Sequence, residues 1–323
     1  MISLSSQLLE LYLKLGAGVS LGWFLGKKLP SVAPVKIGKF LFLIGVPIGI
    51  VAFLRRADLS GAIWLAPVIA WSAIFSGAFL SWLWLKLRVG EEEKSSWSKP
   101  SQGSFILASM VGNTGYLGFP IILTLFGEKY FGWALFYDLL GTTIGIYGLG
   151  ALMGAYFGKG AQDSQQLILT LLKTPALWAL CFGLWFRSIP LPQPLEISLQ
   201  TFAWTVISLS LVLIGMRLSQ IDSWLSLQTA SITLGIKMLL IPLILGLIIF
   251  QFGVHGVPHL VLVLQMSMPP AFGTLVLAEN FDLDRQLAVT ALVVGCGSLL
   301  LMLPVWLLLF GSMDGAFTIS WGF

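Results

Sequence analysis

An apolar segment is interrupted by Gly112-Asn113-Thr114-Gly115-Tyr116-Leu117-Gly118-Phe119-Pro120, and a second one is interrupted by Ser267-Met268-Pro269-Pro270. In both segments Thr-Leu follows the last proline at the fourth and fifth positions, and a Glu followed two residues on by an aromatic closes the segment. Backbone can leave a helix at membrane depth only where it lines a cavity or is buried in protein. Paired interruptions in corresponding places of two halves therefore predict a binding site between them.

The composition places this chain in a lipid bilayer. Of its 323 residues 57% are hydrophobic and 10% are charged, and the mean hydropathy is +0.92. A span needs about 20 apolar residues to cross about 30 Å of hydrocarbon. This length predicts about ten helical spans, near residues 6–29, 36–54, 62–87, 103–126, 131–157, 167–186, 197–219, 228–251, 257–279 and 286–310.

The spans divide into two halves at a short polar link. Residues 1–157 form a first repeat of five spans, residues 158–166 a cytoplasmic link, and residues 167–323 a second repeat with a short C-terminal tail. Because each half has an odd number of spans, the second half enters the membrane in the opposite orientation. The predicted fold is thus all-α, with two inverted repeats whose fourth and ninth spans are broken and meet near the midplane.

Basic residues give the orientation. With the N-terminus outside, the cytoplasmic side receives twelve of them: Lys27, Lys28, Lys36, Lys39, Lys86, Arg88, Lys94, Lys99, Lys159, Lys173, Arg217 and Arg285. The opposite side receives four: Arg55, Arg56, Lys129 and Arg187. Since cytoplasmic loops are enriched in Lys and Arg, both termini are predicted outside. The protein is expected in the plasma (inner) membrane, and its basic residues serve as span anchors without binding nucleic acid.

Other function classes find little support in the sequence. Cys181 and Cys296 lie far apart inside predicted spans and imply no disulfide framework. His255 and His259 are separated by Pro258 and have no obvious third ligand, so no metal site is expected. The chain carries no nucleotide-binding motif and no nucleophile–base arrangement within its spans. We therefore expect neither an enzyme nor a bound cofactor.

Several strings of residues carry a resemblance to a known family. They are Gly112-Asn113-Thr114 with Gly118-Phe119-Pro120, the Lys173-Thr174-Pro175 opening of the sixth span, Gln265 to Pro270 followed by Ala278-Glu279, and Leu303-Pro304-Val305. In order and spacing this chain resembles the auxin efflux carrier family, which includes plant PIN-type carriers and shorter prokaryotic relatives. The resemblance covers nearly the whole chain.

The resemblance implies an architecture similar to the bile-acid sodium symporters. Spans four and nine would cross in a transport domain, and spans one, two, six and seven would form a scaffold, through which a homodimer is suggested. Family members move organic anions, including auxin, malonate and malate, by an elevator-like movement. This chain has only about nine residues between its halves, in place of the long hydrophilic loop of the plant carriers.

The candidate substrate-binding residues gather around the two interruptions. They are Asn113, Thr114, Gly115, Tyr116, Pro120, Gln265, Ser267, Pro269 and Pro270. The Asn113 amide can donate to a carboxylate, although it could instead tie down backbone freed from the helix. The prolines lack N–H groups and disrupt the helical ladder, and the sequence leaves open which of Pro269 and Pro270 marks the crossover. The exposed amides of the half-helix ends favour an anion.

Two ionisable residues lie deeper in the spans than usual. Asp138 falls in the fifth span and Lys237 in the eighth. Such groups are costly in hydrocarbon unless they are paired or face a wet cavity. They could form a buried ion pair, or either could carry a coupling proton, while a lysine that snorkels to the interface is the structural alternative.

These observations favour a secondary carrier for small organic anions, exporting a monocarboxylate or a dicarboxylate. An anion channel or uncoupled facilitator is the alternative, because paired broken helices also build selectivity filters. The expected partners are the anion, the lipid bilayer and a second copy of the chain.

Overall fold

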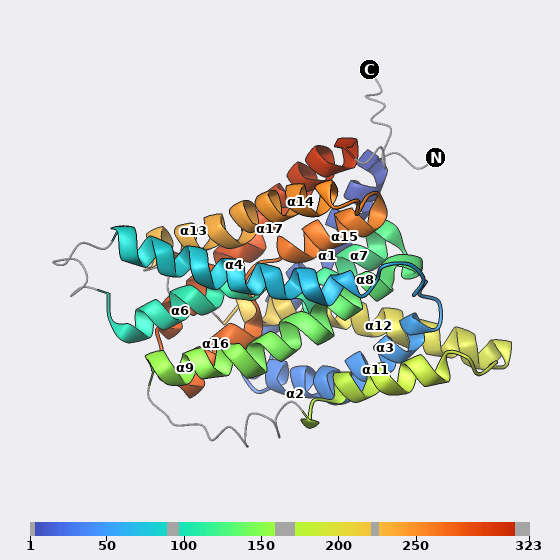
Figure 1. The fold of residues 1–323 in the computed structure, drawn as a ribbon. Coiled ribbons are helices and arrows are strands. Elements are labelled where there is room, and N and C mark those ends of the chain that lie inside the picture. Colours follow the sequence, from blue (N-terminus) through green and yellow to red (C-terminus); the bar gives the residue numbers. More distant parts are fainter. Residues whose placement is uncertain (1–3, 89–96, 159–171, 221–225, 314–323) are drawn as a thin grey trace.

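The computed structural model describes residues 4–88, 97–158, 172–220 and 226–313. Every regular element in this part of the chain is a helix, and one isolated antiparallel bridge joins Gly112 to Pro270 (Figure 1). Of the polar link at 158–166, only Gly158 is among the described residues. The acidic run Glu91-Glu92-Glu93 lies outside them. The expected all-helical class is thus confirmed, and the bridge marks where two segments distant in sequence meet.

Seven helical stretches are long and apolar enough to cross a membrane. They are Leu8–Lys28, Ala33–Leu54, Leu65–Leu87, Glu128–Phe157, Gln193–Leu218, Leu227–Gln251 and Arg285–Met313. Three shorter apolar helices accompany them, at Thr114–Phe126, Pro175–Phe186 and Val257–Met266. This pattern is that of an integral membrane protein, and each of the short helices falls within a span expected from the sequence.

The helices follow one another with few long connections. Those labelled in Figure 1 are α1 (Leu4–Lys28), α2 (Ala33–Phe40), α3 (Val46–Leu54), α4 (Leu65–Arg88), α6 (Lys99–Met110), α7 (Phe119–Phe126), α8 (Phe131–Phe136), α9 (Ala151–Phe157), α11 (Pro175–Phe186), α12 (Gln193–Leu218), α13 (Leu227–Leu234), α14 (Ile241–Gln251), α15 (Val257–Met266), α16 (Phe272–Asn280) and α17 (Arg285–Met313). Short π-helical turns join several of them: η1 (Leu41–Gly45), η2 (Thr114–Gly118), η4 (Tyr137–Thr143), η5 (Ile146–Gly150) and η6 (Gly235–Leu240).

The helices pack in two groups. Helix α1 packs along α12, and α3 packs against both α11 and α12. In the other group α4 packs on α6 and η4, and α17 packs on α13, α15 and α16. Figure 1 shows α3, α11 and α12 along one flank and α4, α6, α13 and α17 along the other. The broken helices belong to the second group and touch the first through α7 and η2.

The two breaks have a local cause. Helix α6 ends at Met110 because Val111 adopts an extended conformation, and the following Gly112 has a low helix propensity. Helix α15 ends at Met266, four residues before the second proline of Pro269-Pro270, and neither proline can donate a backbone hydrogen bond. The first half-helix therefore ends well before Pro120, which lies in the first turn of α7 and not at the break.

Candidate functional site

The two breaks meet through paired backbone. The N–H of Asn113 donates to the carbonyl of Pro269 at 2.7 Å, and the N–H of Ala271 donates to the carbonyl of Val111 at 3.1 Å. These two bonds flank the bridge between Gly112 and Pro270. Each break thereby supplies partners for polar backbone groups of the other, which a buried crossing in a membrane requires. Pro269 accepts the hydrogen bond and Pro270 forms the bridge, so both prolines take part in the crossing.

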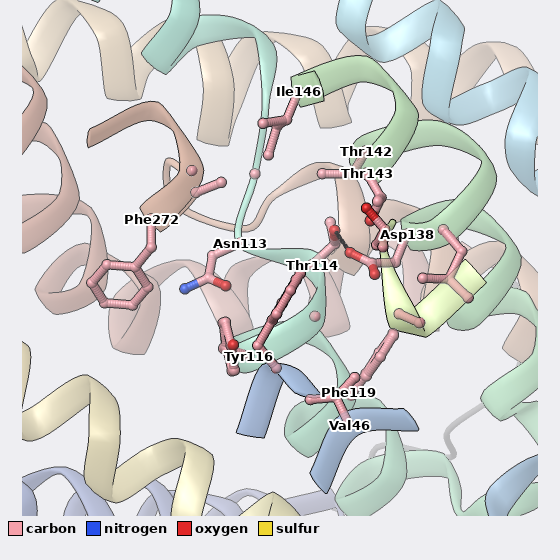
Figure 2. A pocket seen from close by; sticks show the side chains of 18 of the residues that line it. Val46, Asn113, Thr114, Tyr116, Phe119, Asp138, Thr142, Thr143, Ile146 and Phe272 are labelled. Carbon is pink, nitrogen blue, oxygen red and sulfur yellow. Dashed lines mark hydrogen bonds between the residues drawn. The ribbon is translucent and has the colours of Figure 1, made fainter. Parts of the chain in front are cut away.

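A cavity of about 160 Å³ opens beside this crossing (Figure 2). The crossing and the fifth span supply most of its wall, and η1, α3 and α11 of the first helix group supply the rest. Its lining residues are Phe42, Val46, Gly112, Asn113, Thr114, Gly115, Tyr116, Phe119, Asp138, Leu139, Thr142, Thr143, Ile146, Tyr147, Thr174, Ala176, Ala271, Phe272 and Gly273. The cavity therefore lies between the two groups of helices.

Asn113 is the residue at which this cavity has an unused donor. Its side chain is only 4% exposed, and its amide Nδ2 has no hydrogen-bond partner in the described part of the chain. In the same part four other residues carry a buried polar side-chain atom without a partner, namely Gln200, Gln265, Thr290 and Trp306, and none of them lines the cavity. Because a buried donor left unpaired costs about 1–3 kcal/mol, an acceptor at this position would be stabilised.

Further donors come from the start of α16. The N–H groups in the first turn of a helix have no intrahelical acceptors, and those of α16 include Phe272 and Gly273. The N-cap residue Ala271 has no side chain that could accept from them. A positive charge lies close to this turn, since the guanidinium carbon of Arg217 is 5.7 Å from the centroid of the Phe272 ring. The helix dipole and Arg217 thus make this end of the cavity favourable for negative charge.

Asp138 lies at another part of the cavity wall. Its carboxylate accepts a hydrogen bond from the hydroxyl of Thr114 and also interacts with Thr143. A Cβ added to Gly115 would lie 3.5 Å from both of its oxygens, so the carboxylate lies directly against the first turn after the break. Figure 2 shows Asn113 and Phe272 on one side of Thr114 and Asp138 on the other, with the Asn113 nitrogen pointing away from Asp138.

Lys237 approaches the crossing from η6 and is 1% exposed. Its ammonium donates to the carbonyl of Met266 at 2.9 Å, at the C-terminal end of α15. A Cβ added to Gly112 would be 3.2 Å from its Cε, so the lysine stem lies against the first break as well. The described ion pairs do not join Lys237 to Asp138, and the lysine is buried within the protein in this conformation. An ion pair between the two residues at another stage of transport and a proton-coupling role both stay predictions.

The structure brings only part of the predicted substrate-binding set to the cavity. Asn113, Thr114, Gly115 and Tyr116 line it, whereas Pro120, Gln265, Ser267, Pro269 and Pro270 do not. The hydroxyl of Ser267 donates to the carbonyl of Leu264, and the Gln265 amide donates to the carbonyl of Ala134. Pro120 faces a separate hollow with Lys14 and Trp204. Gln265, Ser267, Pro269 and Pro270 therefore lie at the second break outside the cavity, and Pro120 lies in the first turn of α7.

Sequence reasoning missed the contribution of the fifth span. Thr142, Thr143 and Tyr147 line the cavity from η4 and η5. A signal for them exists in the sequence, because Asp138 and Gly141-Thr142-Thr143 form a polar cluster inside an otherwise apolar span. π-Helical turns occur often at functional sites, but they cannot be read from residue periodicity. The aromatic side chains Phe42 and Phe272 were missed as well. Phe42 lies in an apolar run, whereas Phe272 follows Pro270 by two residues and could have been found from the second interruption.

Comparison with known proteins gives a consistent result. A family model described as membrane transport protein matches residues 8–307. An uncharacterized transporter of Methanothermobacter thermautotrophicus is 28% identical over 273 residues, which cover 84% of this chain and 87% of the relative. An uncharacterized transporter of Methanocaldococcus jannaschii is 29% identical over 211 residues, covering 63% of this chain and 67% of the relative. This chain therefore belongs to the membrane transport protein family, the auxin efflux carrier family that its sequence motifs resemble.

Proposed function

We propose that this protein is a secondary carrier for small organic anions and that the anion binds at the crossing of its broken helices. The observation that carries the proposal is the buried amide of Asn113, whose Nδ2 borders the cavity and has no partner among the residues that the structure describes. Binding sites are concave, mostly apolar and equipped with a few placed polar groups, and the cavity has these properties.

A carboxylate fits the donors at one end of this cavity. One oxygen would accept from Asn113 Nδ2, and the other would accept from the first-turn N–H groups of Phe272 and Gly273. Hydrogen bonds to a charged group contribute about 1.5–3 kcal/mol each. Arg217, stacked over Phe272, adds positive potential without a basic side chain entering the cavity. Half-helix ends serve anionic groups in this way in other carriers.

The helix arrangement supports a movement that exposes the site on either side of the membrane. In the proposed topology the seven long stretches and the three short ones make ten spans, five on each side of the link, in two inverted repeats. The group containing α1, α3, α11 and α12 would stay in place as a scaffold, and a second copy would pair through it. The crossing helices would move past it with the anion, in an elevator-type cycle.

The proposed orientation has both termini outside, in the plasma (inner) membrane, with export from the cytoplasm. Its basis is the distribution of basic residues over the loops, which assigns Lys27, Lys28 and Arg285 to the cytoplasmic side. Accessibility of single cysteines introduced at span ends tests it. Labelling from the outside at the position of Lys28 would contradict this orientation.

Counterflow in proteoliposomes tests the proposed function. Vesicles are preloaded with unlabelled indole-3-acetate, malonate or malate, and uptake of the labelled anion is followed against empty vesicles. A carrier gives saturable uptake and stimulation by substrate on the opposite side, because the loaded site returns faster. A channel, the alternative, gives neither saturation at modest concentration nor counterflow.

The absence of counterflow with every carboxylate, from protein shown to be folded, would overturn the proposal. Unitary currents carried by the same anions would instead support a channel.

A further inference from the structure

The cavity beside the crossing has opposite electrostatic character at its two ends. Asn113 and the first turn of α16 present donors at one end, with Arg217 behind Phe272. At the other end stands the carboxylate of Asp138, among the hydroxyls of Thr114, Thr142 and Thr143. None of the lining residues is a lysine, arginine or histidine. A ligand therefore meets a group that attracts negative charge at one end and a group that repels it at the other.

Asp138 is itself an unusual lining group. It is 9% exposed, and its described partners are hydroxyls, which leave lone pairs of a carboxylate unused, since an ionised carboxylate offers about four acceptor sites. The described ion pairs do not include it. A buried carboxylate is stabilised by additional donors, so this end of the cavity favours an N–H or O–H group from a ligand.

Much of the remaining wall is apolar. Phe42, Phe119 and Ile146 line it, together with Val46 and Leu139. A largely apolar wall with two polar ends suits a ligand with an apolar body and two separate polar groups. A second carboxylate reaching Asp138 would be repelled, because two like charges interact strongly where little water screens them.

We propose that the transported anion is a monocarboxylate that also carries a hydrogen-bond donor, an N–H or a hydroxyl, and that Asp138 selects for this donor and against dicarboxylates. The carboxylate of the ligand lies at Asn113 and Phe272, and its donor faces Asp138. This inference rests on the proposed function and narrows its substrate class. It places indole acids and hydroxy acids above malonate.

Matched ligands test this selection. 4-Hydroxybutyrate, butyrate and succinate have four carbons each and differ in carrying, at the end away from the first carboxylate, a hydroxyl donor, no donor or a second carboxylate. Indole-3-acetate and its 1-methyl derivative differ in the N–H. Each is tested as an unlabelled competitor of counterflow in the native protein. For each group of ligands that the protein transports, we expect the acid with the donor to compete about 10-fold to 100-fold better than the acid without it. This is the change in affinity that the loss of one hydrogen bond to a charged group implies.

The variant Asp138→Asn separates selection from transport. It keeps the size of the side chain and an oxygen that can accept from Thr114, but it removes the charge. The ratio of succinate to 4-hydroxybutyrate competition should rise by about 10-fold, because the repulsion is gone. Asp58→Asn is the matched control: Asp58 is exposed, lies outside the cavity and accepts from the N–H of Ser60. It should leave the ranking of ligands unchanged.

The outcomes distinguish this inference from the proposed function. No counterflow with any carboxylate would overturn both. Counterflow in which succinate or butyrate competes as well as 4-hydroxybutyrate, and the methylated indole acid as well as the unmethylated one, would overturn the selection alone. An unchanged ranking in Asp138→Asn would show that another group sets specificity, and it would equally overturn the role of Asp138.

Discussion

At the break after α6 the Asn113 amide Nδ2 borders a cavity and has no partner in the described part of the chain, whereas at the break after α15 the Lys237 ammonium donates to Met266. The Gln265 amide nitrogen near the second break likewise donates to Ala134, and neither Gln265 nor Lys237 lines the cavity. Both breaks use the same backbone pairing. Their surroundings differ in the donors: Lys237 and Gln265 donate to backbone carbonyls of the protein, although Gln265 Oε1 has no described donor, and the Asn113 donor faces the cavity. We infer that the first break binds the ligand and the second holds the crossing together.

The largest effect is expected from Lys237→Met. Methionine fills similar space but cannot donate, so the carbonyl of Met266 and the negative end of the α15 dipole lose their cation. The loss of a hydrogen bond to a charged group should lower the free energy of unfolding by about 1.5–3 kcal/mol. Thermal denaturation in detergent measures it. Lys14→Met, at an exposed lysine paired with Glu10, is the control. A native-like melting temperature of Lys237→Met would contradict a structural role for the second break.

Gln265→Ala should mainly affect stability. Its side chain is fully buried, and the substitution removes the hydrogen bond to Ala134 and leaves a cavity. We expect the free energy of unfolding to fall by about 1–3 kcal/mol and the ligand affinity to stay unchanged. Thermal denaturation in detergent, with and without ligand, separates the two quantities. A weakened affinity at unchanged stability would place Gln265 in the binding site.

A smaller effect is expected from Gly112→Ala. The added Cβ would lie 3.0 Å from the carbonyl oxygen of Met268 and 3.2 Å from the Cε of Lys237. The two chains of the crossing would have to separate by a few tenths of an ångström, at a cost of about 1 kcal/mol. Melting temperature reports this cost. Gly16→Ala, at a helical glycine with open space around it, is the control. Equal stability of the two variants would argue against a tightly packed crossing.

The smallest effect is expected from Thr290→Val. Its hydroxyl is buried without a partner in the described part of the chain, but Thr290 lies in α17 and does not line the cavity. Replacing an unpaired hydroxyl by a methyl of similar shape is nearly neutral, within about 1 kcal/mol. Transport and melting temperature should both match the native protein. A loss of transport would mean that an unpaired buried atom outside the cavity also matters for transport. The unpaired donor of Asn113 would then no longer be specific evidence for ligand binding at the first break.

The sequence predicted the broken helices well, because Gly112 and Pro269-Pro270 act locally on backbone conformation and need no tertiary information. It also predicted that Asn113 lies at the break, where the structure places it beside the cavity. The sequence did not show which of the two breaks borders the cavity. Gln265 and Ser267 are polar residues near the second break, but in the structure they donate to backbone carbonyls of the protein. That choice depends on packing between segments far apart in the chain.

The position of Asp138 shows the same limit. Its burial and its span were evident from the sequence, but its place in the cavity depends on the π-helical turn η4, which shifts the face on which it lies. A π-helical turn inserts an extra residue into the helical repeat and so alters the faces that a regular periodicity predicts. The same holds for Lys237 in η6, whose partner is a backbone carbonyl that no side-chain pattern indicates.

Binding of the ligand at the first break through Asn113 is measured by the affinity of the Asn113→Ala variant. The substitution removes an amide that has no described partner, so the melting temperature without ligand should stay close to native. The concentration of the best competing carboxylate that halves counterflow should rise by about 10-fold to 100-fold. An unchanged half-inhibitory concentration in a folded, active Asn113→Ala protein would contradict the account and move the binding site away from the crossing.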